Sequence, residues 1–123
     1  MEDKYFYRQL VDEVPLPMYV FQDGDIKFCN RAFCDFSGYS RQEIQSIHFL
    51  DLIHPDDREK LMIQTRVALS GGSQKLPKKP ELSVILKDGQ VRRVQTRPKV
   101  IEYQGLPAIL GLVIDLTDLN KSE

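Results

Sequence analysis

Three dipeptides that end in glycine constrain the fold more than any other feature of the sequence. Asp23-Gly24, Asp88-Gly89 and Gln104-Gly105 each join two short runs of β-forming residues. Tight hairpin turns need positive φ angles, which glycine adopts freely, so each dipeptide predicts an antiparallel hairpin. The predicted strands are 18–22, 26–29, 81–87, 91–103 and 106–115. Strands in two groups, with a helical segment between them, predict an α+β fold.

The segment between the two groups of strands carries the start and stop signals of short helices. Asn30 stands at the N-cap position of a predicted helix 31–36, where its side-chain oxygen can accept a bond from a free backbone N–H. Gly38 is the expected end of that helix, because glycine tolerates the left-handed cap. Ser40 and Glu43 have the spacing of a capping box, which predicts a second short helix from about residue 41.

The longest predicted helix, 55–69, follows His54, Pro55 and two aspartates, the second of which is Asp57. Proline suits the first helical position, and the aspartates place negative charge at the positive end of the helix dipole. The same residues could form an acid–base or metal site, since imidazole and carboxylate groups supply both. We favour the helix cap, because the proline already explains the pattern. The sequence therefore assigns no catalytic residue and no metal ligand.

An amphipathic helix is predicted over residues 2–14, before the first strand. Phe6, Leu10 and Val14 lie on one apolar stripe, and Pro15 ends the helix. The stripe is wider than a short terminal helix needs. The helix is therefore expected either to fold back on the sheet or to pair with a second copy of the chain.

The last predicted strand, 106–115, is apolar on both faces, which indicates that both faces are covered. We expect the domain's own helices to cover the face with Leu110 and Leu112. The other face, with Ile109 and Val113, would meet helix 2–14 or a second subunit. The expected homodimer contacts are Phe6, Leu10, Val14, Ile109 and Val113.

Composition limits the remaining classes of function. The chain has 123 residues, 41% of them hydrophobic, which is enough for one core without disulfides. A formal net charge of −1 gives no basic face for nucleic acid, and no apolar run is long enough to insert into a membrane. Cys29 and Cys34 form no disulfide framework, so a reduced, cytoplasmic setting is the simpler interpretation. Each cysteine is expected to be a small buried apolar residue rather than a metal or redox site.

Taken together, these motifs resemble the PAS family of sensory domains over about residues 5–118. The resemblance depends on several motifs that follow one another in the order typical of the family. They are Asp23-Gly24 followed by residues 26–30 and Phe33, then Gly38-Tyr39-Ser40 followed by Glu43, then residues 52–58, then Asp88-Gly89, and finally Asp115-Leu116-Thr117. Each piece alone is common, but the set at this spacing is specific for the fold. A PAS fold implies one antiparallel sheet of strand order 2-1-5-4-3, with helices across one face.

The resemblance also implies a small apolar cavity between the sheet and helix 55–69. Core and ligand wall need the same residue types, so each candidate could simply fill the core. The candidate lining residues are Phe33, Phe36, Ile44, Ile53, Leu61, Met62, Thr65, Val84, Leu86, Leu110 and Leu112.

Covalently bound flavin and haem, two cofactors of the PAS family, are disfavoured because the side chains that would bind them are missing. Relatives that bind flavin covalently carry a cysteine near the position of Phe49, and many that bind haem carry a histidine on the long helix; this chain has neither. Non-covalent flavin is less clearly excluded, although no tryptophan is present to stack on it. We therefore expect no cofactor or an unidentified small molecule.

The resemblance implies a signal-input domain of a larger protein, such as a bacterial or archaeal two-component sensor histidine kinase. Residues 1–14 would be a flanking helix, 15–118 the PAS domain and 119–123 the start of an output helix capped by Thr117. The signal would pass through Asp115 and Thr117 to a downstream output domain in the same chain. The alternative is a ligand-free dimerisation module, and an enzyme is less favoured than either.

Overall fold

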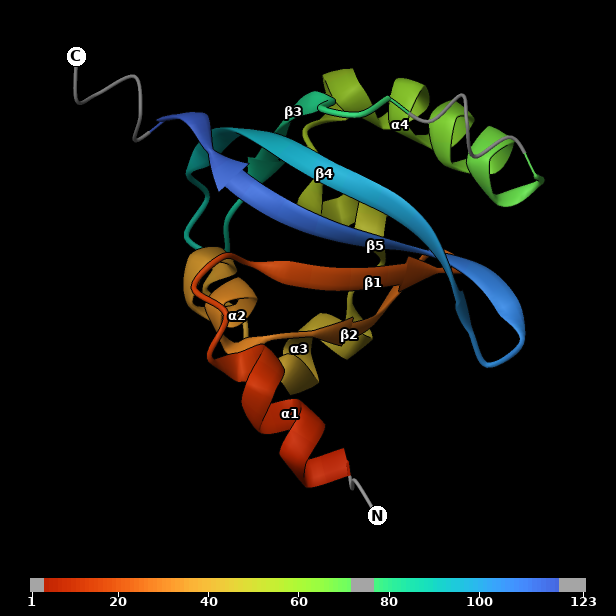
Figure 1. Cartoon of the computed structure of the whole chain (residues 1–123). Coiled ribbons are helices and arrows are strands. Elements are labelled where there is room, and N and C mark those ends of the chain that lie inside the picture. The colour runs from red at the N-terminus through yellow and green to blue at the C-terminus, as the bar shows by residue number, and fades with distance from the viewer. Residues whose placement is uncertain (1–3, 72–76, 118–123) are drawn as a thin grey trace.

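The computed structural model describes residues 4–71 and 77–117 (Figure 1). Its sheet is antiparallel with the order β2-β1-β5-β4-β3, which confirms the α+β class and the strand order implied by the resemblance. The elements are α1 (Lys4–Asp12), β1 (Met18–Gln22), β2 (Asp25–Cys29), α2 (Arg31–Ser37), α3 (Arg41–Ser46), η1 (Phe49–Leu52), α4 (Pro55–Leu69), β3 (Glu81–Ile85), β4 (Val91–Tyr103) and β5 (Leu106–Asp115).

All three glycine dipeptides lie in hairpin turns, as predicted. Asp23 and Gly24 have φ angles of 56° and 82°, and the turn between β4 and β5 likewise has two consecutive residues at positive φ. Such turns match the twist of the strands they join. Gly89 has a φ of 90° in the turn between β3 and β4, and its N–H donates to the Leu86 carbonyl oxygen at 2.9 Å, so the turn already begins at Leu86. Strand β3 therefore ends two residues earlier than predicted.

The short helices are capped as the sequence predicts. The Asn30 side chain accepts a hydrogen bond from the Phe33 N–H at 3.0 Å, and Gly38 ends α2 in the left-handed conformation at φ 86°. Ser40 and Glu43 form both bonds of the capping box at the start of α3. A hydrogen bond from Lys87 is the largest of the effects that lower the pKa of Glu43. These bonds fix where each short helix begins and ends.

The start of α4 is a helix cap that also fastens the helix to β3. His54 Nδ1 accepts from the Asp56 N–H at 3.1 Å, and Pro55 is the first helical residue. Asp57 Oδ2 accepts from the Ser83 N–H at 2.8 Å, and the His54 N–H donates to the Ser83 carbonyl at 2.9 Å. Within residues 4–71 and 77–117, no group of three or more His, Cys, Asp or Glu side chains could hold a metal ion.

The helices α2, α3 and α4 lie across one face of the sheet, and the core fills the space between these two layers (Figure 1). Ile44 and Ile53 from the helical layer and Val94 from β4 are the largest fully buried apolar side chains. No helix in the described part of the chain is long and apolar enough to cross a membrane.

Helix α1 does not fold back on the sheet, which was the first of the two expected alternatives; pairing with a second copy is the other. It extends beyond the β2 edge of the sheet and has no buried residue (Figure 1). Phe6 and Leu10 are 47% and 52% exposed. The reason is the anchor at its C-terminal end: Asn30 Nδ2 donates to the Val11 carbonyl at 3.2 Å, and Asp12 pairs with Arg41. These contacts hold the end of α1 at the corner between β2 and α2, away from the outer face of the sheet.

Candidate functional site

An apolar cavity of about 60 Å³ lies between the inner face of the sheet and the helical layer. The helices α2 and α4 and the segment η1 contribute one wall, and β1, β3, β4 and β5 contribute the other. Seven of the candidate residues line it: Phe33, Phe36, Ile53, Leu61, Thr65, Val84 and Leu86.

The two faces of β5 are the reverse of the prediction. Ile109 and Val113 are buried and line the cavity, whereas Leu110 and Leu112 lie on the outer face and are half-buried. The register sets this arrangement, because Ile109 pairs with Phe21, whose side chain also lines the cavity. Neighbouring residues across a pair of strands share a face. Alternation alone could not identify the inner face, since both faces are apolar.

Two further candidates lie outside the cavity. Ile44 is 1% exposed but packs into the core beside β2, because α3 covers that strand rather than β5. Met62 is 41% exposed, since α4 turns Leu61, Thr65 and Ala68 toward the sheet and leaves Met62 at the edge of this stripe. Neither side chain therefore belongs to the cavity wall.

The sequence interpretation did not include two hydroxyl groups of the cavity wall, those of Tyr19 and Thr96. Tyr19 and Thr96 both line the cavity and are both buried. Burial raises the pKa of Tyr19 to about 12, and a side-chain hydrogen bond with Thr96 partly offsets this effect. The alternation of Tyr19 and Phe21 along β1 was the available signal, because residues two apart on a strand share a face. This pair adds polar groups to a cavity whose lining is mostly apolar.

A surface groove of about 270 Å³ lies on the outside of the cavity wall. Phe21, Phe49, Leu61 and Thr65 line both the groove and the cavity. The groove and the cavity are therefore neighbouring spaces that share these four side chains.

Strand β5 ends at a junction that several polar contacts fix. Asp115 Oδ2 pairs with Arg92 at 3.1 Å, and its Oδ1 accepts from the Thr117 N–H at 2.9 Å. Thr117 Oγ1 accepts from the Arg93 N–H at 2.8 Å. Asp115 therefore bonds the backbone two residues further on, and the Thr117 hydroxyl group bonds β4. The predicted linker, 119–123, lies outside the described residues.

Comparison with known proteins agrees with this architecture. A model of the PAS fold matches residues 26–112. The chain belongs to the PAS fold family. No match is found among curated proteins.

Several solved structures resemble this PAS domain. The PAS domain of an HTR-like protein from Haloarcula marismortui is 24% identical with a TM-score of 0.74, over 90% of this chain and 89% of that one. A domain of a sensory box sensor histidine kinase/response regulator from Geobacter sulfurreducens is 23% identical with a TM-score of 0.72, over 93% and 98%. A LOV protein from Rhodobacter sphaeroides is 17% identical with a TM-score of 0.71, over 100% and 73%. At these identities the likeness shows the fold.

Covalent flavin and haem do not fit the cavity of this PAS domain. The described residues that line it include neither a cysteine nor a histidine. Phe49, near the position of the cysteine in flavin-binding relatives, is 7% exposed and packs on Phe21 with ring centroids 4.5 Å apart. A cavity of about 60 Å³ has room for only about four to six water molecules. A large ligand would therefore require parts of the cavity wall to move apart.

Proposed function

We propose that this PAS domain is a non-catalytic, cytoplasmic input module of a larger signal-transduction protein, such as a sensor histidine kinase. The proposal depends on one observation: strand β5 lines the cavity and also ends at the junction. Ile109 and Val113 of β5 line the cavity, and Asp115 ends the same strand in its contacts with β4 and Thr117. The output domain, a histidine kinase or a cyclase, would lie downstream in the same chain.

Signal transfer by this route needs a ligand or a packing change that favours one position of β5 over another. A small apolar molecule in the cavity would contact Ile109 and Val113 directly. A shift of the strand would then alter the contacts of Asp115 with Arg92 and Thr117. The junction responds in this scheme without any intermediate element.

Filling the cavity tests the relay. Val113→Ile adds one methylene on the cavity side of β5, and we expect the amide exchange rate of Thr117 to change severalfold, because its N–H donates to Asp115. Val100→Ile is the control, since it adds the same methylene to β4 at a residue that does not line the cavity. Hydrogen exchange followed by NMR measures both. Equal exchange at Thr117 in wild type and Val113→Ile would contradict the relay.

Native mass spectrometry of the protein as purified tests the ligand directly. A bound small molecule of constant mass supports the sensing role. Its absence, together with a cavity that stays closed to small apolar probes such as xenon, favours the second candidate. That candidate is a ligand-free dimerisation module that aligns output domains.

The exposed apolar side chains of α1 favour a homodimer. Phe6 and Leu10 are about half exposed, and Val14 is half-buried. The outer face of β5 contributes Leu110 and Leu112 to the proposed dimer surface, because Ile109 and Val113 lie inside. The dimer would assemble through these residues under either candidate function.

A charge on this helix should separate the two copies. Leu10→Glu is expected to shift the protein from dimer to monomer, because a dimer would bury the carboxylate without a partner. Light scattering at several concentrations measures the change, and Gln9→Glu is a matched control on the same helix. A wild-type protein that is monomeric at every concentration would reject the homodimer.

A further inference from the structure

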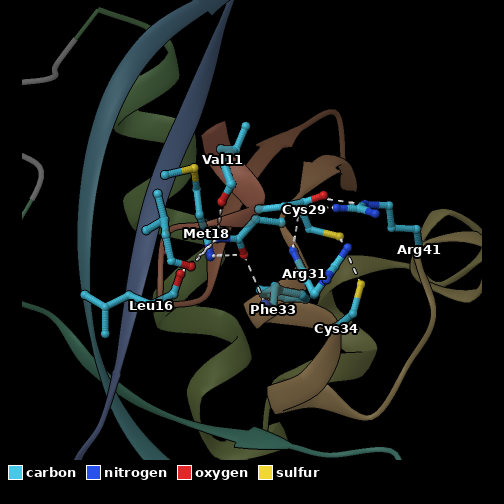
Figure 2. Close-up of polar contacts among 11 residues, drawn as sticks. Val11, Leu16, Met18, Cys29, Arg31, Phe33, Cys34 and Arg41 are labelled. Carbon is cyan, nitrogen blue, oxygen red and sulfur yellow. Dashed lines mark hydrogen bonds and ion pairs between the residues drawn. The ribbon is translucent and has the colours of Figure 1, made fainter. Parts of the chain in front are cut away.

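The two cysteines of the chain lie next to each other, although they come from different elements. Cys29 is the last residue of β2 and Cys34 lies in α2, and their Sγ atoms are 3.9 Å apart (Figure 2). The tight connection through Asn30, which caps α2, brings the helix back over the end of the strand. Neither sulfur lines the cavity. The sequence predicted two separate buried apolar residues, whereas in the structure the two sulfurs are in contact.

We propose that Cys29 and Cys34 are a redox modification site, which a hydroperoxide converts into a reversible intramolecular disulfide that alters the docking of α1. A disulfide needs an S–S distance of about 2.05 Å, so the two sulfurs must approach by roughly 2 Å. In this proposal, rotation of the two side chains and a movement of α2 toward the end of β2 together supply that distance. The site is separate from the cavity and holds whether or not the cavity binds a ligand.

The surroundings of the two sulfurs decide which one reacts first. Cys29 is 4% exposed, while Cys34 is half-buried and can be reached by solvent. Burial, followed by the proximity of Cys34, raises the pKa of Cys29 to about 12, although Arg41 and Arg8 act in the opposite direction. Either sulfur could be the donor in the contact between the two sulfurs, so the difference in exposure decides the order of reaction. Cys34 is the accessible sulfur and the first to be oxidised.

The reaction balances in two steps. The Cys34 thiolate attacks one oxygen of hydrogen peroxide, the O–O bond breaks, and hydroxide leaves while Cys34 becomes a sulfenic acid. Cys29 then forms the S–S bond, and the sulfenic oxygen leaves with the Cys29 proton as water. Over both steps, two thiols lose two electrons and two protons, and the peroxide becomes two water molecules. A dithiol reductant reverses the change by thiol–disulfide exchange.

The pair lies where α1 is held. The carbonyl oxygen of Cys29 accepts a bond from Arg41 Nε at 3.2 Å, and the same guanidinium pairs with Asp12 at the end of α1 (Figure 2 shows Cys29 and Arg41). Asp12 Oδ1 also accepts from the Arg31 N–H at 2.9 Å. Drawing α2 toward the end of β2 changes the spacing of these partners. Formation of the disulfide therefore disturbs the contacts that fix α1.

Treatment of the purified, reduced protein with hydrogen peroxide tests the site. We expect both titratable thiols to be lost, the intact mass to fall by about 2 Da, and a peptide joining Cys29 to Cys34 to appear within the monomer. Dithiothreitol should restore both thiols. Cys29→Ser should instead accumulate an oxygen adduct on Cys34, and Cys34→Ser should react more slowly than Cys29→Ser. Two thiols that remain titratable, or a disulfide found only between chains, would overturn the proposal.

The coupling to α1 needs its own measurement. Hydrogen exchange of residues 4–12 should differ severalfold between the oxidised and reduced wild-type protein. The double variant Cys29→Ser/Cys34→Ser, treated with peroxide in the same way, controls for oxidation elsewhere. Equal exchange in the two redox forms would overturn the coupling, and neither result depends on the relay through β5.

Discussion

Replacing Asn30 with alanine is expected to lower the free energy of unfolding by about 3–5 kcal/mol, a large share of the stability of a domain of this size. The side chain is fully buried and makes five hydrogen bonds. Its Oδ1 accepts from the Met18 N–H at 2.9 Å and the Phe33 N–H at 3.0 Å (Figure 2 labels these partners). Its Nδ2 donates to carbonyl oxygens, including that of Leu16 at 3.0 Å. Alanine would remove every one of these bonds and leave buried groups without partners.

Urea denaturation measures the loss of unfolding free energy, and a substitution at an exposed helix cap gives a value for comparison. Ser40→Ala removes an equivalent N-cap bond at the surface and should cost only about 1 kcal/mol. Asn30→Asp keeps both acceptor bonds but has no donor for the carbonyls of Val11 and Leu16. We expect Asn30→Asp to increase hydrogen exchange in α1 more than in α2. If Asn30→Ala costs no more than Ser40→Ala, the side chain is only a helix cap and does not connect α1 to the sheet.

The strand order could be predicted because the turns and the last strand carry strong local signals. Positive φ angles at Asp23 and Gly24 require the residues found there, and the hairpin follows from them. The apolar character of β5 on both faces indicates a central strand, and the structure places it between β1 and β4. Which face of β5 points inward depends on its register with β1. Register is a long-range property, and two equally apolar faces give no local sign of it.

The cavity wall was predicted well where side chains come from elements with one polar and one apolar face. Phe33 and Phe36 of α2 are examples, and both line the cavity. Met62 was wrongly included because α4 has apolar residues on several sides, among them the exposed Ile63 and Val67. The sequence of such a helix does not show which of its sides faces the sheet.

The contact between Cys29 and Cys34 could not be predicted from their spacing. A separation of five residues has no fixed geometry across the end of a strand and the start of a helix. The angle at which α2 leaves β2 depends on the buried Asn30 and its bonds to the segment before β1. A pair formed by tertiary structure therefore appears in the sequence as two unrelated small residues.

Gly111→Ala is expected to lower the free energy of unfolding by about 2–3 kcal/mol, through overpacking rather than backbone strain. Gly111 pairs with Tyr19 across β5 and β1, and the tyrosine ring lies over it. A Cβ at position 111 would lie 2.5 Å from the Tyr19 hydroxyl oxygen and 2.7 Å from its Cε1. The ring cannot easily move away, because it is 7% exposed and packs on Phe33 and Phe49 with centroids 5.9 Å away in each case.

The sign of the effect distinguishes this explanation from ordinary strand propensity. Alanine within a strand is normally favoured over glycine by about 0.5–1 kcal/mol, so the substitution should stabilise the domain if the ring did not matter. In a Tyr19→Leu background the obstructing ring is absent, and Gly111→Ala should then be neutral or slightly stabilising. Urea denaturation of the wild type, the two single variants and the double variant should give a coupling energy of about 2 kcal/mol or more. Additive effects would show that Tyr19 does not require glycine at position 111. The cavity wall around Tyr19 and Thr96 would then accommodate an extra methyl group on β5.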